Sequence, residues 1–389
     1  MNGGTVFGRV RDIYLKVFAE LCANQANISD YPHCTQIDSR VVICKAQVLL
    51  EGVATDREAV MTELHHLFRH GPGVMVVRGA YPDLQVIDRH SRVFESIFAY
   101  EAQRGMAADH FAKAGSNGRI WNSLQKAAEQ SPESFIEYYA NPLLGLIAEA
   151  WLGPYFQATA QVNVVYPGGQ AQQPHRDYHL GFQADDEVAR FPLPLHLLSQ
   201  YLTLQGAVAH SDMPLESGPT LLLPFSQQYE LGYLAWRDPA FIAYFQEHAV
   251  QLPLNKGDLL FFNPALFHAA GTNRTADVQR MANLLQISSA FGKPMETIDR
   301  DRMMLALYPA LLQRLEQGAL NDESLSAVIA MAGDGYSFPT NLDADPPVNG
   351  LAPQTGQQLM FEALSQRWPL PTFSERVAEM RAKRGISGD

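Results

Sequence analysis

The stretch ATAQVNVVYPGGQAQQPHRD, residues 158–177, joins a strand pattern to a turn and then to a group of polar residues. Small and β-branched side chains dominate its first nine residues, and Pro167-Gly168-Gly169 marks the turn. Runs of the same kind recur as far as about residue 291, at 200–209, 219–224, 250–254, 258–263 and 281–290. Short strands separated by glycine and proline predict a β-barrel or sandwich rather than a parallel sheet with crossover helices.

Helical patterns flank this β-rich region on both sides. Before it, we expect helices over 12–24, 56–70 and 84–104, and a short buried strand over 74–77. Thr55 or Asp56 is the expected N-cap of the second helix. After it, we expect helices over 296–318 and about 373–384. The loop between them, 333–356, is rich in proline, glycine and aspartate, and we interpret it as a lid.

The composition excludes several classes of protein. The chain has 389 residues, of which 47% are hydrophobic and 18% are charged, so it can bury a large core and is not disordered. Its formal net charge of −12 argues against a nucleic-acid or anionic-membrane surface, because either needs a basic stripe. The most apolar segment, 259–271, is too short and too interrupted to span a bilayer. We therefore expect a small-molecule substrate as partner, with no nucleic acid and no membrane.

The cysteines and the N-terminus predict a cytoplasmic location. Cys22, Cys34 and Cys44 are odd in number, which favours reduced structural thiols over a disulfide framework. The first residues lack the basic and apolar stretches of a secretory signal.

The residues that carry chemistry begin at His175 and Asp177. On an extended strand, residues two apart project from the same face, so this imidazole and this carboxylate can meet at one point. A second imidazole, His268, follows the very apolar stretch 258–267. Two histidines and one carboxylate on one face of an octahedral Fe(II) leave three positions open, as non-haem iron oxygenases require. Zinc is the rival metal, although its open sites use a different geometry.

An arginine downstream of His268 can hold an anion beside such a metal. Arg280 lies twelve positions after His268 and leads into a predicted strand. Its guanidinium can bind a carboxylate in bidentate fashion and anchor a dicarboxylate whose other end chelates the metal. Arg274, in the Gly-Thr-Asn-Arg-Thr turn, is the competing anchor and is expected to be exposed.

These motifs together resemble the phytanoyl-CoA dioxygenase-like family of Fe(II)/2-oxoglutarate-dependent oxygenases. The resemblance covers roughly residues 70–290, and its motifs are QPHRD (173–177), Asp212-x-x-x-Glu216-Ser217-Gly218-Pro219 running into LLLPFSQ (221–227), Lys256-Gly257-Asp258-Leu259, and HAAGTNRT (268–275) followed by Arg280. It implies a double-stranded β-helix (jelly-roll) core, Fe(II) bound by His175, Asp177 and His268, and 2-oxoglutarate held by Arg280.

The resemblance also sets expectations for organisation and reaction. The fold class is mainly β with α elaboration, divided into an N-terminal helical extension (1–70), a jelly-roll oxygenase core (71–293) and a C-terminal helical extension with its loop packed on the core (294–389). The expected reaction uses O2 to hydroxylate, or otherwise oxidise, an unactivated C–H bond, with decarboxylation of 2-oxoglutarate to succinate and CO2. Related halogenases replace the carboxylate of the metal site, so Asp177 favours oxygenation.

Two alternatives to this function stay open. The chain can be an iron oxygenase of the same fold that does not use 2-oxoglutarate, or a catalytically silent jelly-roll binding protein.

Ala270 stands where relatives often have a serine that helps to hold the cosubstrate, so that hydroxyl must come from elsewhere.

Further residues are candidates for the pocket. Asn163 and Gln161 alternate on the strand before the turn, where they hold cosubstrate or substrate, or form a structural hydrogen bond across the sheet. His179 faces the cavity if the strand continues past Asp177, and is otherwise an exposed histidine. Trp121 lines the mouth of the pocket or belongs to a surface loop. A second His-x-Asp, His210-Ser211-Asp212, is interpreted as a capped turn rather than as the iron site.

Overall fold

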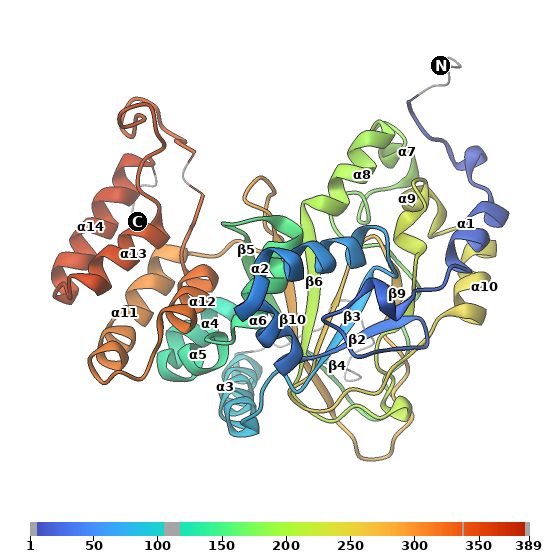
Figure 1. The fold of residues 1–389 in the computed structure, drawn as a ribbon, viewed down its shortest axis with the longest axis horizontal. Coiled ribbons are helices and arrows are strands. Elements are labelled where there is room, and N and C mark those ends of the chain that lie inside the picture. The colour runs from blue at the N-terminus through green and yellow to red at the C-terminus, as the bar shows by residue number, and fades with distance from the viewer. Residues whose placement is uncertain (1–5, 105–116, 337, 386–389) are drawn as a thin grey trace.

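An eight-stranded sheet lies at the centre of the computed structural model, which describes residues 6–104, 117–336 and 338–385 (Figure 1). The strand order is β1-β2-β3-β8-β6-β10-β5-β4; β2 and β3 run parallel, and the other neighbours run antiparallel. The bounds of these strands are β1 Gln36–Asp38, β2 Val41–Lys45, β3 Val74–Arg78, β4 Asn117–Ile120, β5 Gln157–Val165, β6 Thr203–Ala209, β8 Leu259–Phe262 and β10 Arg280–Ser288.

A second, two-stranded sheet completes the core. It consists of β7 (Leu221–Leu223) and β9 (Phe267–Ala269), with Leu222 opposite His268. An antiparallel bridge between His175 and His268 adds the metal-site segment to its edge. An apolar layer that includes Val76, Leu222 and Leu260 lies between the two sheets. This arrangement confirms the predicted jelly-roll core.

Helices surround this core on several sides (Figure 1). The α-helices of the described residues are α1 Leu15–Cys22, α2 Ala46–Arg69, α3 Leu84–Gln103, α4 Ser123–Gln130, α5 Pro132–Tyr139, α6 Pro142–Leu152, α7 Asp185–Val188, α8 Leu193–Tyr201, α9 Gly232–Ala235, α10 Pro239–His248, α11 Arg300–Glu316, α12 Asp322–Ala332, α13 Gly356–Ser365 and α14 Leu370–Lys383. In Figure 1, α11 to α14, drawn in orange and red, form a layer at the end of the molecule beside α4 and α5.

Side chains along β5 point alternately to the hydrophobic core and to a cavity. Ala158, Ala160 and Val162 pack into the large hydrophobic core, which also contains the apolar faces of α2 and α6. Gln161 and Asn163 lie on the opposite face and line a cavity. Because successive side chains of a strand point to opposite faces, the strand keeps its polar residues away from the helices.

Several expected elements differ from the observed ones. The run 250–254 does not form a strand; only Val250 and Leu254 form isolated bridges, and Pro253 within the run has no N–H to donate. Residues 200 and 201 belong to α8, so β6 begins only at Thr203. The helices α4 to α10, α12 and α13 lie where we expected none.

The second predicted helix is the C-terminal half of a longer one. Helix α2 begins at Ala46 and has non-helical backbone angles at Asp56. The Asp56 side chain accepts a hydrogen bond from the N–H of Ala59, as an N-cap residue does. The expected start at Asp56 therefore corresponds to this kink.

The N-terminal region 1–70 is not purely helical, because its strands β1 and β2 join the main sheet.

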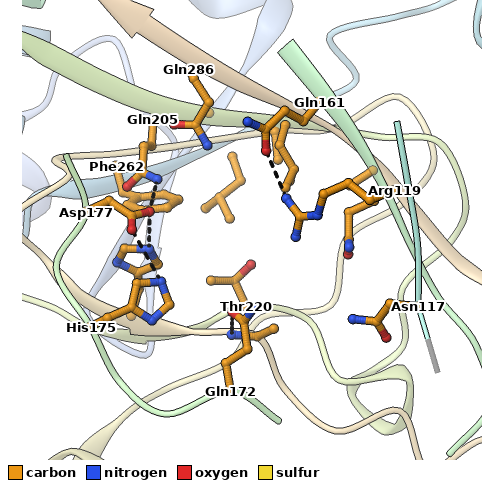
Figure 2. A pocket seen from close by; sticks show the side chains of 18 of the residues that line it. Asn117, Arg119, Gln161, Gln172, His175, Asp177, Gln205, Thr220, Phe262 and Gln286 are labelled. Carbon is orange, nitrogen blue, oxygen red and sulfur yellow. Dashed lines mark hydrogen bonds and ion pairs between the residues drawn. The ribbon is translucent and has the colours of Figure 1, made fainter. Parts of the chain in front are cut away.

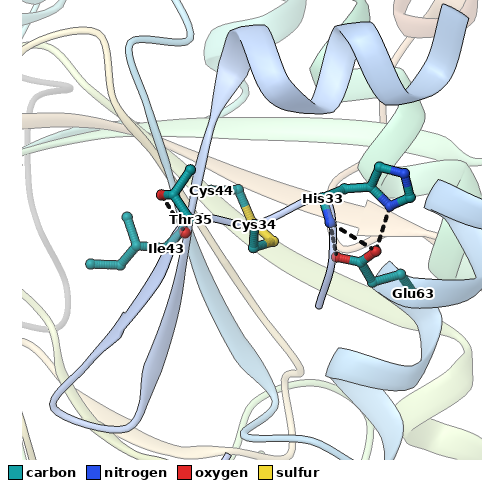
Figure 3. The surroundings of a disulfide bond; sticks show 6 residues. All are labelled: His33, Cys34, Thr35, Ile43, Cys44 and Glu63. Carbon is teal, nitrogen blue, oxygen red and sulfur yellow. Dashed lines mark hydrogen bonds and ion pairs between the residues drawn. A yellow bond between two sulfur atoms is a disulfide. The ribbon is translucent and has the colours of Figure 1, made fainter. Parts of the chain in front are cut away.

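The expectation that all three cysteines are reduced thiols is wrong. Cys34 and Cys44 form a disulfide (Figure 3), and Cys22 is buried and free. The β1–β2 hairpin explains the bond, because Thr35 donates its N–H to the carbonyl of Ile43 and thereby brings the neighbouring cysteines together. One argument for a cytoplasmic location is therefore lost. Among the described residues, no helix has the length and apolar character needed to cross a membrane.

Candidate metal centre and its cavity

A cavity of about 680 Å³ lies between the two sheets. Figure 2 shows its polar residues in two groups, with His175, Asp177 and Gln205 on one side and Asn117, Arg119 and Gln161 on the other. The remaining lining is largely apolar and includes Leu260, Phe262 and Leu284.

The structure brings together His175, Asp177 and His268 at one point of this cavity. Each offers one ligand atom, and these atoms lie within 4.8 Å of one another. The Nε2 atom of His175 lies 3.7 Å from Oδ1 of Asp177, and Nε2 of His268 lies 3.4 Å from Oδ2 of Asp177. No other group of three such side chains is found among the residues described.

Backbone hydrogen bonds orient both imidazoles. Nδ1 of His175 lies 2.9 Å from the carbonyl oxygen of Gln173, and Nδ1 of His268 lies 2.8 Å from that of Leu266. Because a carbonyl only accepts, each Nδ1 carries the proton and each Nε2 keeps its lone pair for a metal. The donor set therefore fits a divalent metal ion with open positions.

Neighbouring charges and hydrogen bonds keep the Asp177 carboxylate ionised, so that it can bind a cation. Burial by itself raises the pKa of Asp177, but His175, His268 and Gln205 together hold that pKa below its usual range. Burial lowers the pKa of His175, which favours its neutral form. The Gln205 side-chain amide donates to Oδ2 of Asp177 and fixes the carboxylate. Gln205 was not predicted from the sequence, because it lies on another strand.

Arg176 connects the segments that carry the ligands. Its Nη2 donates to the carbonyl oxygens of Ser226 (2.6 Å) and Tyr229 (3.0 Å), and the side chain is almost fully buried. The hydroxyl of Ser226 accepts the N–H of Phe267, the residue before His268. The arginine between His175 and Asp177 is thus a positioning residue for both sides of the centre.

The two arginines considered as anchors have different environments. Arg280 is the first residue of β10, lines the cavity and is 7% exposed, whereas Arg274 is exposed. The Arg280 guanidinium has no hydrogen bond or ion pair with any side chain that the structure describes. Burial lowers its pKa to about 10, so it stays charged at neutral pH. Thr220 is the sole hydroxyl-bearing residue among the described residues of the lining.

Gln161 lies on the side of the cavity away from Asp177 (Figure 2), and Trp121 and Asn163 also line the cavity. Nη1 of Arg119 donates to Oε1 of Gln161 at 2.9 Å, and the Arg119 guanidinium lies 4.9 Å from the centre of the Trp121 ring. Glu296, which the sequence did not single out, completes this group.

Two other histidines do not contribute to the cavity. The strand does not continue past Asp177, since Tyr178 and His179 have positive φ angles, and Nδ1 of His179 lies 2.9 Å from Oγ of Ser199. The expectation that His179 faces the cavity is therefore wrong. His210 is buried, with its ring nitrogens 2.8 Å from Ser91 Oγ and from the Tyr138 hydroxyl. The described part of the loop 333–356 contributes no residue to the lining, and its role as a lid stays a prediction.

Comparison with curated proteins finds fungal dioxygenases. Dioxygenase cdmD of Talaromyces verruculosus is 28% identical over 37% of this chain, and dioxygenase trt7 of Aspergillus terreus is 28% identical over 45%. Dioxygenase olcK of Penicillium canescens is 23% identical over 67% of this chain. These alignments cover 43%, 57% and 82% of the respective relatives, so the chain spans about half the length of the first two.

Comparison with solved structures finds distant similarity. The α-ketoglutarate-dependent epimerase SnoN from nogalamycin biosynthesis matches with a TM-score of 0.41 and 16% identity, over 60% of this chain and 82% of SnoN. AviO1 from Streptomyces viridochromogenes matches with a TM-score of 0.39 and 16% identity, over 54% of this chain and 87% of AviO1.

The sequence profile of phytanoyl-CoA dioxygenase matches residues 70–282, which is more than half of the chain. The matched region contains β3, most of the jelly-roll core, all three candidate ligands and Arg280. The expected family is confirmed. It is a family of enzymes that use Fe(II) and 2-oxoglutarate. This protein belongs to the phytanoyl-CoA dioxygenase family.

Proposed function

We propose that the protein is an Fe(II)- and 2-oxoglutarate-dependent oxygenase that hydroxylates, or otherwise oxidises, an unactivated C–H bond of a small organic molecule. One observation supports this most: a single cavity holds a two-histidine, one-carboxylate cluster and a buried arginine with no side-chain partner among the described residues. A buried charge without a partner is costly, and a bound carboxylate removes that cost.

His175, Asp177 and His268 hold Fe(II) through two imidazole nitrogens and one carboxylate oxygen. When bound, the metal and 2-oxoglutarate together supply the C–H oxidation with O2, and 2-oxoglutarate leaves as succinate and CO2. The carbonyls of Gln173 and Leu266 keep each imidazole in the tautomer that a metal needs, and Gln205 keeps the carboxylate in place.

Arg280 binds the distal carboxylate of 2-oxoglutarate. Its planar guanidinium forms two parallel hydrogen bonds to a carboxylate, which a lysine ammonium does not reproduce. A local cation is required because the chain as a whole carries a net charge of −12 and repels a dianion. Thr220 is our candidate for the assisting hydroxyl, and Asn163 is a second polar contact.

The apolar walls exclude water from the reacting carbon. Leu260 and Phe262 on β8 and Leu284 on β10 line the cavity, and the Phe262 ring packs against His268. A water-poor cavity strengthens the charge interactions within it and limits side reactions.

Succinate release tests this proposal. The purified protein with Fe(II), O2 and 2-oxoglutarate should form succinate slowly even without substrate, and the rate should rise in a screen of small organic molecules. Oxidation of a hit that proceeds without 2-oxoglutarate would favour the alternative iron oxygenase. Absence of Fe(II) and 2-oxoglutarate binding would favour a silent binding protein.

A further inference from the structure

The side of the cavity away from the metal ligands carries a second polar group that the proposed chemistry does not use, and its glutamate is half-buried. It consists of Arg119 on β4, Gln161 on β5 and Glu296 after β10. Arg119 and Gln161 are 8% and 4% exposed. Figure 2 shows Arg119 and Gln161 across the cavity from Asp177 and His175.

Hydrogen bonds fix the positions of these side chains. Arg119 donates from Nη1 to Oε1 of Gln161 at 2.9 Å. The backbone N–H of Asn122 donates to Oε1 of Glu296 at 2.6 Å. The second oxygen of that carboxyl group, Oε2, is buried and has no hydrogen-bond partner among the residues that the structure describes. A buried carboxyl oxygen without a partner is costly, so a ligand that donates a hydrogen bond to it is favoured.

The surroundings define the rest of the ligand. Much of the rest of the cavity lining is apolar and includes Leu260, Leu284 and Met295. A hydroxyl group both donates and accepts, so it can donate to Glu296 and accept from a neighbouring donor such as Arg119. A charged ammonium group is less suitable because it would face the Arg119 cation.

We propose that Glu296, together with Arg119 and Gln161, binds a hydroxyl group of the substrate, and that the substrate is an apolar molecule with an alcohol or phenol at the end remote from the oxidised carbon. The identification of this ligand as the substrate rests on the proposed function. The hydroxyl contact itself depends only on the residues of the cavity.

The electrostatics of Glu296 agree with a neutral ligand. Burial raises the pKa of Glu296 to about 7, although the Asn122 N–H, Lys126, Gln161 and Arg119 all favour the charged form. Near neutral pH the group is therefore only partly ionised and does not demand a cation.

A matched pair of probes tests this assignment in the metal-free protein. The steroid alcohol androstanol and its parent hydrocarbon androstane differ only by the hydroxyl. Binding is followed by tryptophan fluorescence, because Trp121 and Trp236 line the cavity. The proteins compared are wild type, Glu296→Leu and Glu296→Gln, with Glu129→Gln as a control that neutralises a carboxylate on α4 outside the cavity.

At pH 8.5, above the pKa of Glu296, the wild-type protein and Glu129→Gln should bind androstanol about 10- to 100-fold more tightly than androstane, the range for a hydrogen bond to a charged group. Glu296→Leu should lose most of this preference, although Arg119 can still donate to the hydroxyl, and it should keep the wild-type affinity for androstane, which also shows that the cavity is intact. Glu296→Gln should keep part of the preference through its amide oxygen. The assignment is overturned if wild type binds both probes equally or binds neither, or if Glu296→Leu keeps the full preference. Since no metal is present, this outcome is independent of whether the iron and 2-oxoglutarate proposal holds.

Discussion

The Nε2 atom of His268 lies 3.4 Å from Oδ2 of Asp177, the same oxygen that accepts a hydrogen bond from the Gln205 amide. His268 comes from β9, Gln205 from β6, and Asp177 from the segment that pairs with β9 through His175. Three separate parts of the chain thus fix one carboxylate. Pairing within and between the sheets therefore brings the three candidate ligands together.

Replacing Gln205 should weaken metal binding without removing a ligand. In Gln205→Leu, Asp177 loses the amide that orients it, and Fe(II) affinity should fall about 10- to 100-fold, as is typical when a partner of a metal ligand is lost. The exposed Gln183→Leu is the matched control and should bind as wild type does. Anaerobic calorimetric titration with Fe(II) measures both. Unchanged affinity in Gln205→Leu would mean that the amide does not support the centre.

Replacing Arg280 should raise the requirement for 2-oxoglutarate. In Arg280→Lys the charge stays but one of two parallel hydrogen bonds is lost, so the KM for 2-oxoglutarate should rise about tenfold, with a smaller change in kcat. Arg274→Lys, at the exposed position, should leave the KM unchanged. Succinate formation at varied 2-oxoglutarate concentration gives both constants. The opposite result, a raised KM only in Arg274→Lys, would transfer the anchor to Arg274.

The parts of the site that follow from local sequence were predictable. His175 and Asp177 are two apart, and the motifs around His268 and Arg280 occur in a recognised order, so the cluster and the jelly-roll core could be predicted together. The strands 158–166 and 281–290 also correspond closely to β5 and β10.

The remaining features depend on pairing across the chain. Gln205 and Glu296 sit in stretches that carry no motif, and only the fold brings them to the cavity. The orientation of His179 could not be predicted, because two successive positive φ angles end the strand pattern. The disulfide depends on the β1–β2 hairpin, which is not evident from the spacing of Cys34 and Cys44.

Thiol titration should find no reactive cysteine in the native protein and one after denaturation. Cys34 and Cys44 are bonded to each other, and burial raises the pKa of Cys22 to about 12, which suppresses the reactive thiolate. Reduction of the denatured chain should then give three thiols. Ellman titration of protein purified without reductant measures each step. Three thiols in the unreduced denatured chain would contradict the disulfide.

Glu296 should make stability depend on pH. Folding raises the pKa of Glu296 from 4.5 to about 7, so the folded state holds a proton that the unfolded state has lost between these values. The stability of wild type should therefore fall as pH rises from 4.5 towards 7, relative to Glu296→Gln, and the difference should then level off. Urea unfolding of both proteins at pH 5 and pH 8 measures this effect. A stability difference that is the same at both pH values would contradict the shift.

The metal centre is tested most directly by the visible absorption that Fe(II) and 2-oxoglutarate give when they bind together in the absence of O2. Wild type and His179→Ala, whose histidine lies outside the cavity lining, should both give this band. His175→Ala and His268→Ala should each abolish it while remaining folded by circular dichroism. A band that survives in both ligand variants, or one that disappears in His179→Ala instead, would contradict the assignment of His175, Asp177 and His268 as the iron site.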